Sequence, residues 1–352
     1  MKLVEGICSN CESIIDFTGC IPFSYVKCKK CSTTLVVPVI FGKFHLMNKL
    51  TENTLFIEYE GYDVSNQRNV ILLTLNNSLQ DHDRWLTLCK TEAAMLKNFD
   101  DDSIHSLTSF GVVDNTFYIA TSFIDCFDMT EYDPNNVGDF EVSSIIDFMK
   151  KFAVIIEHLH SRNIEHHNIV PENIIVNEQS HIMLRNLFIS RVTYVYESEL
   201  GIKSSTSPYY ISPEKAGKGT EGKKGDVFSF GVLIYYLFTG KYPFDGESES
   251  EIIYSRVKKR GNSQTQVIYK VDYLVPIDLI ELRPHDLEPE LSDLISSMLQ
   301  AYPIQRPAIP EVIDALLLLD VKEDQKKINL ETKAIVDSCH TQKIPMMKPF
   351  ER

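Results

Sequence analysis

The spacing of apolar and polar positions predicts short strands through the first third of the chain. Residues 13–39 contain three brief alternating runs, "SIIDF", "FSYVK" and "TTLVVPV", as expected for half-buried strands. Residues 44–75 hold three longer strand-like runs separated by turn residues, and residues 111–124 hold two more. This part of the chain is therefore predicted to be rich in β-structure.

Helical periodicity dominates the remainder. Residues 85–99 read as one helix, and in residues 144–160 the apolar side chains recur at steps of three and four. From 226 to 238 nearly every position is apolar, which is typical of a helix buried on all sides. The pattern thus predicts an α+β protein, in which strands, one helix and further strands are followed by the longer helices.

The first forty residues add a cysteine pattern to their strands. Cys8-x2-Cys11 and Cys28-x2-Cys31 are separated by sixteen residues, which is the spacing of a structural zinc site. Four thiolates would leave no open position for catalysis, and Cys20 is expected not to be a ligand. Residues 1–38 resemble a zinc ribbon. Four reduced cysteines without metal are the alternative, and a thioredoxin-like redox pair is disfavoured because no βαβ pattern surrounds them.

Charge and composition limit the partners that the chain would bind. It has 352 residues with a formal net charge of −14, which disfavours binding to nucleic acid or to anionic membranes. The ribbon-like segment itself is nearly neutral, so we expect its contact to be with a protein. The N-terminus lacks the apolar core of a signal peptide, and no apolar run reaches the ~20 residues of a membrane helix. A cytoplasmic location is expected.

Five motifs occur in a fixed order through the second half of the chain. They are "HHNIVPENIIV" from His166, "HIMLRNLFIS" around Asn186, "TSPYYISPE" ending at Glu214, "GDVFSFGVLIYYLFTGKYPF" around Asp226 and "PIQRP" with Arg306. Together they resemble the protein-kinase superfamily. The resemblance implies a bilobal kinase-like fold, with a small β-rich lobe at 39–125 and a larger helical lobe at 126–318, preceded by the ribbon and followed by a charged tail at 319–352.

The resemblance assigns architectural roles to several residues. Arg306 would pair with Glu214, and His166 would pack inward at the start of the catalytic loop. Asp226 is expected to cap the N-terminus of its helix, and the resemblance adds that it would hold the catalytic-loop backbone. Glu92 would correspond to the helix glutamate of the small lobe, left without a partner, or would be a solvated surface residue.

At the catalytic positions the sequence departs from the family's pattern. Residues 50–56 occupy the place of the glycine-rich loop but contain no glycine. Leu73 replaces the lysine that holds phosphates, Asn168 replaces the catalytic base and Asn186 replaces the magnesium-binding aspartate. Asn173 is retained and could still touch a metal or nucleotide. An amide cannot accept a proton at neutral pH, and a positioned base is worth ~10²–10⁴ in rate.

These departures predict a pseudokinase that acts as a scaffold or an allosteric signalling partner, with a structural zinc ion and an unidentified protein partner. The alternative is a nucleotide-binding protein with residual Ser/Thr kinase or other transferase activity using ATP and Mg²⁺. A third hypothesis, a zinc-dependent nucleic-acid binder, is disfavoured by the acidic charge. Residues 246–290, with a basic patch at 256–260, are predicted to be an insertion, and a helix is predicted over 324–338.

Overall fold

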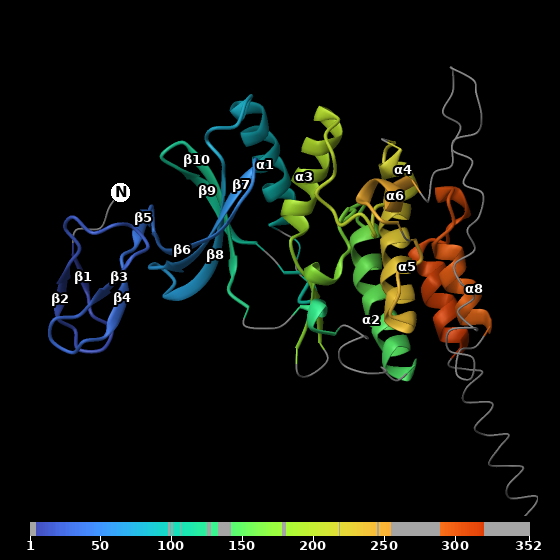
Figure 1. The fold of residues 1–352 in the computed structure, drawn as a ribbon, viewed down its shortest axis with the longest axis horizontal. Coiled ribbons are helices and arrows are strands. Elements are labelled where there is room, and N and C mark those ends of the chain that lie inside the picture. Colours follow the sequence, from blue (N-terminus) through green and yellow to red (C-terminus); the bar gives the residue numbers. More distant parts are fainter. Residues whose placement is uncertain are drawn as a thin grey trace, which may run out of the picture. The chain divides into compact units, whose positions relative to one another are not determined.

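The computed structural model describes residues 5–97, 99, 101–105, 107–124, 128–132, 142–177, 181–217, 219–244, 246–254 and 289–319. The chain divides into two compact units. The first combines Met1–Asp133 with Glu165–Ser207, and the second combines Pro134–Ile164 with Pro208–Arg352 (Figure 1). The domain boundaries expected from the sequence remain predictions.

The first unit begins with two small antiparallel hairpins. Strand β1 (Glu5–Ile7) pairs with β2 (Ile14–Asp16), and β3 (Tyr25–Lys27) pairs with β4 (Thr34–Val36). Each turn between paired strands carries one Cys-x-x-Cys. The small core between the hairpins consists of Cys8, Ile15, Phe17, Cys28 and Val37. Because so few apolar residues are buried, the cysteines make up a large part of this core.

The two hairpins repeat each other at an offset of twenty residues, a relation that the sequence reading did not identify. The backbone N–H of Cys8 donates to Ser13 and that of Cys28 donates to Thr33, both at 2.9 Å. The residue after the second cysteine has positive φ in both hairpins, 58° at Glu12 and 61° at Ser32. The same backbone turn is therefore built twice, with different side chains on it.

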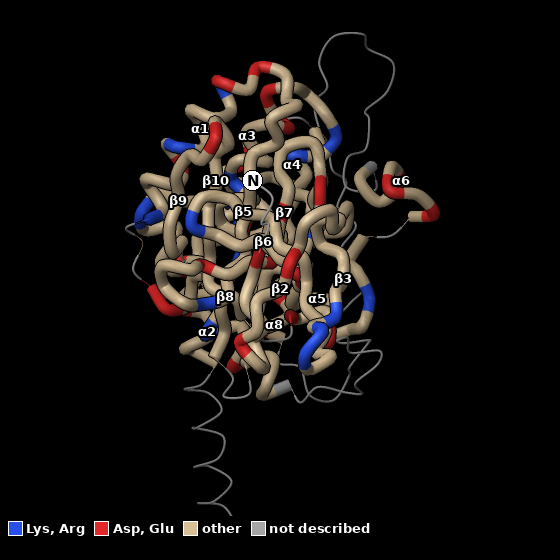
Figure 2. The backbone as a smooth tube through the Cα atoms, turned by 90° about the vertical axis from the view of Figure 1, so that its left-hand side faces the viewer, with Lys and Arg blue, Asp and Glu red and all other residues tan. Residues whose placement is uncertain are grey.

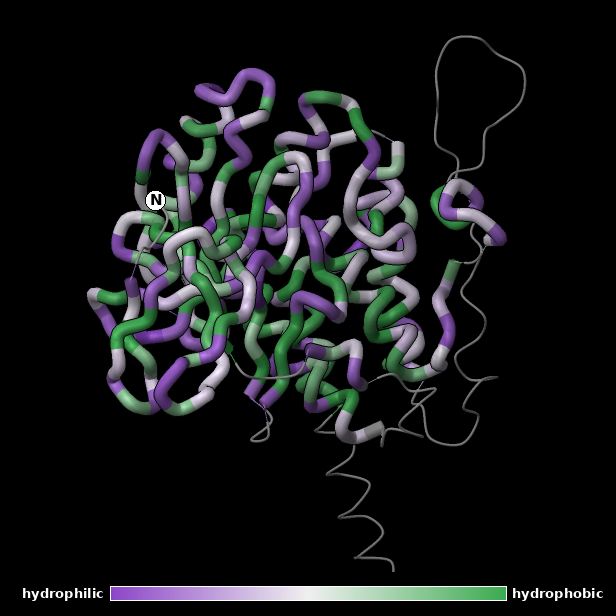
Figure 3. Tube along the Cα trace, turned by 60° about the vertical axis from the view of Figure 1, so that its left-hand side comes forward, coloured by the Kyte–Doolittle hydropathy of each residue, from purple (hydrophilic) through white to green (hydrophobic). Residues whose placement is uncertain are grey.

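A six-stranded antiparallel sheet follows the hairpins, in the order β5-β6-β7-β8-β10-β9. The strand bounds are β5 Val39–Phe41, β6 Phe44–Glu52, β7 Phe56–Asp63, β8 Arg68–Leu75, β9 Leu107–Val113 and β10 Thr116–Ser122. Apolar residues from one face pack into a common cluster, formed by Phe44, Leu46, Val70, Leu72, Tyr118 and Ala120. Hydrophobic stretches alternate with hydrophilic ones along the chain, and many of the outlying turns are hydrophilic (Figure 3).

Two helices complete the first unit. Helix α1 (His82–Leu96) buries Trp85, Cys89, Ala93 and Leu96, and helix α3 (Leu187–Leu200) packs beside it. The rings of Trp85 and Tyr196 meet edge to face at 4.8 Å between centroids. Short elements precede α3, namely the 3-10 turns η1 (Met129–Tyr132) and η2 (Pro171–Asn173), then β11 (Ile174–Val176) paired with β12 (Ile182–Leu184).

The regular elements among the described residues of the second unit are all helices. Helix α5 (Lys223–Thr239) is buried on every side and packs against α2 (Val142–His160) and α8 (Pro289–Met298). The shorter elements are α4 (Pro213–Ala216), α6 (Glu249–Tyr254) and η3 (Pro303–Gln305), and residues 309–319 are helical. Within the described part of the chain, every helix is too short or too polar to cross a bilayer.

The observed elements match the predicted α+β class, with a β-rich part and a helical part. Most of the predicted insertion at 246–290, its basic patch and the helix expected at 324–338 lie outside the described residues.

Candidate functional site

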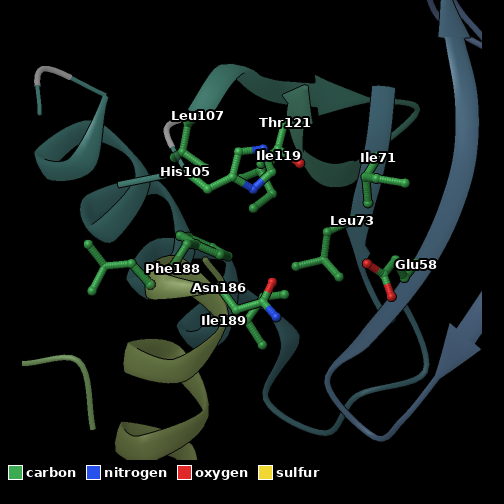
Figure 4. A pocket seen from close by; sticks show the side chains of 11 residues that line it. Glu58, Ile71, Leu73, His105, Leu107, Ile119, Thr121, Asn186, Phe188 and Ile189 are labelled. Atoms are coloured by element: carbon green, nitrogen blue, oxygen red, sulfur yellow. The ribbon is translucent and has the colours of Figure 1, made fainter. Parts of the chain in front are cut away.

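The place predicted for a nucleotide is lined mainly by apolar side chains. Leu73 lies on β8, is 6% exposed and faces a pocket of about 30 Å³, which is room for about two or three water molecules. Ile71, Leu73 and Phe188 supply apolar walls to this pocket (Figure 4). The ring of Phe188 also packs against Phe56 and Phe117.

One carboxylate also lines this pocket. Glu58 of β7 is the direct cross-strand neighbour of Leu73 on β8, and both side chains appear in the same wall (Figure 4). The Glu58 carboxylate accepts a hydrogen bond from the Thr51 hydroxyl at 3.1 Å. The wall therefore presents a negative group beside the position where a kinase would carry a lysine. The sequence reading did not single out Glu58.

A second titratable group of the pocket is His105. Its Nε2 lies 3.0 Å from the carbonyl oxygen of Ser122. Burial lowers the pKa of His105, and the positive charge of Arg185 acts in the same direction. The ring is therefore neutral near pH 7 and adds no positive charge to the pocket.

The segment around Asn168 is held by a chain of hydrogen bonds. His166 donates from Nε2 to the carbonyl of Arg185 at 3.0 Å, which leaves Nδ1 to accept from the Asn168 N–H at 3.3 Å. The amide of Asn173 donates to the Asn168 carbonyl at 2.8 Å. His166 is fully buried, so it lies inward as expected. The buried Oδ1 of Asn168 has no hydrogen-bond partner among the described groups.

Asn186 and Asn173, both predicted site residues, contact each other. Asn186 Nδ2 donates to Asn173 Oδ1 at 2.9 Å. Asn186 has positive φ, 65°, and stands directly before α3, a conformation that asparagine tolerates better than most residues. An aspartate at 186 has no N–H to donate, so this contact depends on the amide that replaces the expected carboxylate.

The expectation that Glu92 lacks a partner is wrong. The guanidinium of Arg191, on α3, donates from Nε to a Glu92 oxygen at 2.8 Å and from Nη1 to the Glu165 carbonyl at 3.0 Å. The side chains of Arg191 and Glu92 are 15% and 13% exposed, so Glu92 is not a solvated surface residue either. The sequence reading treated this region as a metal-binding segment and missed the helix that places Arg191.

Of the architectural residues predicted in the second unit, Arg306 and Asp226 are buried and the Glu214 side chain is 12% exposed. Arg306 donates to both carboxylate oxygens of Glu214, at 2.8 and 2.7 Å. Asp226 is not the capping residue of its helix, because α5 begins three residues earlier, at Lys223. It is instead buried within the first turn, and its carboxylate lies 3.0 Å from His160 Nε2.

The four ribbon cysteines converge on one point. Their sulfur atoms all lie within 4.8 Å of one another, and the Cys8–Cys31 and Cys11–Cys28 separations are 3.5 and 3.6 Å. Tetrahedral ligation with bonds of 2.3 Å requires sulfur separations of about 3.8 Å. Contact with the Thr33 hydroxyl lowers the pKa of Cys31 to about 5, and thiolate is the ligating form. The donor set therefore fits a metal ion such as zinc.

Known proteins resemble most of this chain. It is 27% identical over 218 residues to the serine/threonine-protein kinase PrkC of Bacillus subtilis, covering 60% of this chain and 33% of that protein. It is 23% identical over 251 residues to the serine/threonine-protein kinase nekl-2 of Caenorhabditis elegans, covering 67% and 68%. The chain spans about a third of the length of PrkC.

A solved structure and a family model agree with these relatives. The kinase domain of PknI from Mycobacterium tuberculosis matches with a TM-score of 0.56 at 19% identity, covering 80% of this chain and 98% of that one; at this identity it supports the fold alone. The model described as "Protein kinase domain" matches residues 58–317. Because that match covers well over half of the 352 residues, the chain belongs to the protein kinase domain family.

Proposed function

We propose that this kinase-family chain is a pseudokinase, which acts by binding another protein and not by transferring phosphate. The observation that carries the proposal is the contact between Asn186 and Asn173. In an active kinase these two positions hold Mg²⁺ through an aspartate and an asparagine. Two neutral amides that are hydrogen-bonded to each other make a poor site for Mg²⁺, a hard cation that prefers carboxylate oxygens.

The pocket wall supports the same conclusion. Phosphoryl transfer depends on positive groups that neutralise the charge of the transferred phosphate. Leu73 provides no such charge, and Glu58 opposite it on the next strand would repel phosphates. The predicted base position holds Asn168, which cannot take up a proton near pH 7. Three requirements of catalysis would therefore be unmet in the first unit: a magnesium site at Asn186, a phosphate-binding cation at Leu73 and a base at Asn168.

Helix α3 supports the proposal at a further position. In active kinases the helix glutamate pairs with the strand lysine. In this chain Arg191 of α3 pairs with Glu92, so the glutamate has a cationic partner from a different element. Leu73 offers no cation to Glu92, so Arg191 is the residue that balances the charge of the Glu92 carboxylate.

We further propose that Cys8, Cys11, Cys28 and Cys31 bind one structural Zn²⁺ and that the resulting ribbon contacts a protein partner. The sulfur separations support this assignment. The hairpins bury few apolar residues, so metal binding would supply much of their folding free energy. All four ligands would be supplied by the protein, which leaves no open coordination position and favours a structural role over a catalytic one.

Thermal unfolding of the full-length, zinc-loaded protein tests the proposal. The midpoint is measured alone, with ATP, and with ATP plus Mg²⁺ or Mn²⁺, and incorporation of phosphate into generic protein substrates is followed in parallel. Trp85, the single tryptophan, is buried in α1, so its fluorescence reports on the unit that would hold the nucleotide. We expect no shift and no transfer. A ligand at ~100-fold over its Kd would stabilise the protein by about 2.7 kcal/mol.

A metal-dependent shift together with phosphate transfer would overturn the pseudokinase proposal in favour of residual kinase activity. A shift without metal or transfer would also contradict the prediction of an empty site, and would indicate that nucleotide acts as a structural ligand. Zinc content is measured separately on the same preparation. Less than one equivalent of zinc after refolding in zinc would contradict the metal assignment alone.

A further inference from the structure

Exposed apolar side chains are concentrated on the two N-terminal hairpins. Among the described residues, five large apolar side chains are more than 70% exposed: Ile7, Ile14, Ile21, Tyr25 and Ile304. Four of these five lie within residues 7–25. Isolated exposed apolar residues are ordinary on protein surfaces, whereas a group of them within so small a module marks an interaction surface.

The second hairpin combines this exposure with positive charge. Residues 17–51 contain five lysines and no aspartate or glutamate, although the whole chain carries a net charge of −14. Lys43 and Lys49 are already paired with Asp63 and Glu52. The other three, Lys27, Lys29 and Lys30, are exposed on and beside β3, where lysines appear blue (Figure 2).

Tyr25 lies on the same face of β3 as Lys27, because side chains two residues apart on a strand point the same way. Tyr25 is 75% exposed. In the described part of the chain β3 pairs only with β4, so its other edge is open. We define the basic face as Tyr25, Lys27, Lys29 and Lys30.

The repeat shows that the fold does not require this basic face. The residues twenty positions earlier occupy the equivalent turn in the first hairpin, and they are Glu5, Ile7, Ser9 and Asn10. The same backbone is thus formed without a lysine or a tyrosine at any of the four positions. Part of the positive charge would offset the metal site, because four thiolates exceed the charge of Zn²⁺ by two. Lys29 also interacts with Asp16, which leaves Lys27 and Lys30 without a carboxylate at ion-pair distance among the described residues.

We propose that the basic face binds an acidic peptide segment that carries an aromatic or aliphatic side chain. Carboxylates would contact the lysines, an apolar side chain would pack on Tyr25, and the extended peptide would add to the open edge of β3. This inference rests on the proposed function, because it names the chemistry of the partner that the ribbon contacts.

A peptide fits better than a nucleic acid. Double-stranded DNA carries a charge for every ~1.7 Å of its axis, so a chain with a net charge of −14 would repel it over a long distance. A short peptide places a few carboxylates on the lysines and brings little further charge near the rest of the protein. All the cations of the face are lysines, which lack the fork of donors with which arginine recognises phosphate.

Fluorescence anisotropy of labelled peptides with the full-length, zinc-loaded chain tests this proposal. The probe is a twelve-residue peptide in which glutamates alternate with leucine and phenylalanine, and its counterpart has lysine at each glutamate. We expect the acidic probe to bind and its affinity to fall with added salt. The counterpart is expected not to bind. Equal binding of the two peptides would overturn the proposal.

The repeat supplies a matched control for substitution. The variant Lys27→Ser/Lys29→Ser lowers the net charge by two at the basic face, and Ile7→Glu/Ser9→Glu lowers it by the same amount at the equivalent positions of the first hairpin. We expect the first variant to lose about tenfold in affinity for the acidic probe and the second about twofold or less. Tyr25→Ala should cost roughly fivefold. Equal losses in the two charge variants would contradict a specific face.

A single-stranded oligonucleotide with the same net charge as the acidic peptide is measured in parallel. Tighter binding of the oligonucleotide would overturn the proposal and identify the face as a nucleic-acid site. Zinc content, measured on every variant, separates loss of the face from loss of the ribbon. The nucleotide measurements described above are made on the same preparation, so failure of the pseudokinase proposal is distinguishable from failure of peptide binding.

Discussion

At the level of single residues, the candidate site has side chains that resemble the catalytic ones in shape but differ in charge. Asn186 is close in size to aspartate, yet it donates a hydrogen bond to Asn173 that a carboxylate is unable to donate. Leu73 fills the position of the expected lysine and is 6% exposed. We expect these two replacements to stabilise the site in its neutral form, because the Asn186 amide gains Asn173 as a partner and a buried charge at position 73 is avoided.

Asp63 differs from these neutral site residues, because its carboxylate is buried and yet retains its charge. Burial acts to raise its pKa, but hydrogen bonds from Lys43 and Asn66 outweigh burial and hold the pKa below its ordinary value. The Lys43 ammonium lies 2.8 Å from one oxygen, and backbone N–H groups of Ser65 and Asn66 donate to the other. The ionised form therefore stabilises the turn between β7 and β8.

We expect Asp63→Asn to lower the free energy of unfolding at pH 7 by about 1–3 kcal/mol, because charge-assisted hydrogen bonds are lost. A depressed folded-state pKa contributes stability above the unfolded pKa of about 3.9 and loses it as pH falls through the folded value. The difference between variant and wild type should therefore shrink below about pH 4. Urea titrations followed by Trp85 fluorescence measure this difference. Asp83→Asn, at a fully exposed position, is the control, and a pH-independent difference would contradict the account.

For single residues, the sequence predicted contacts correctly where a motif specifies both the residue type and its position in the fold. The cysteine spacing anticipated four converging sulfur atoms, and the positions of Glu214 and Arg306 anticipated their contact. It missed Glu58 and Arg191, because nothing near either residue in the sequence indicates its partner. The cross-strand register brings Glu58 opposite Leu73, and the packing of α3 on α1 brings Arg191 to Glu92.

At the level of elements, the packing of α3 against α1 organises the first unit. Two ion pairs join these helices. The pair Arg191–Glu92 is largely buried, whereas in Arg84–Glu199 the side chains are 59% and 38% exposed. The edge-to-face contact of Trp85 with Tyr196 lies in the same interface. The interface thus contains one buried pair and one exposed pair that can be compared directly.

We expect Arg191→Ala to destabilise the first unit by about 2–4 kcal/mol, because it leaves the Glu92 carboxylate buried without its cation. Arg84→Ala, the matched control in the same interface, should cost less than about 1 kcal/mol. Adding Glu92→Gln to Arg191→Ala should recover part of the loss, since the unpaired charge is then removed. Urea unfolding followed by Trp85 fluorescence measures all three. Equal costs for the two arginines would contradict a stabilising role for the buried pair.

The sequence predicted most elements of the fold, and α3 is the informative exception. Strands at 44–75 and helices at 144–160 and 226–238 follow from clear periodicity. The residues of α3 also contain an apolar series at steps of four, Phe188, Val192 and Tyr196, and a glycine at the helix end, Gly201. That signal was overlooked because the kinase-like motif suggested an irregular metal-binding segment there. Strand β1, three residues long, was too short for periodicity to reveal.

At the level of the whole molecule, the chain keeps the family fold, and the pseudokinase proposal holds that it has lost the family's chemistry. The pairs Arg306–Glu214 and His160–Asp226 join residues of the second unit that are largely buried. Under this proposal, Glu58 opposite Leu73 and the pairing of Arg191 on α3 with Glu92 would oppose nucleotide binding in the first unit, in addition to the three neutral substitutions. Loss of activity is therefore expected to involve more positions than the motif residues alone.

This argument predicts that restoring the motif residues does not restore activity. The triple variant Leu73→Lys/Asn168→Asp/Asn186→Asp should transfer no phosphate and should show no shift of Tm with Mg²⁺ and ATP. The new ammonium would stand opposite Glu58 and be neutralised by it, and Glu92 would remain paired with Arg191. Adding Glu58→Ala and Arg191→Ala to the triple variant removes both obstacles, and we expect the first nucleotide-dependent rise in Tm only then. Phosphate transfer by the triple variant alone would indicate that Glu58 and α3 are no obstacle.

A further outcome is that the variant with all five substitutions folds, as judged by Trp85 fluorescence, without responding to nucleotide. That result would place the barrier elsewhere, and the glycine-free turn at 53–55 would be the next position to change.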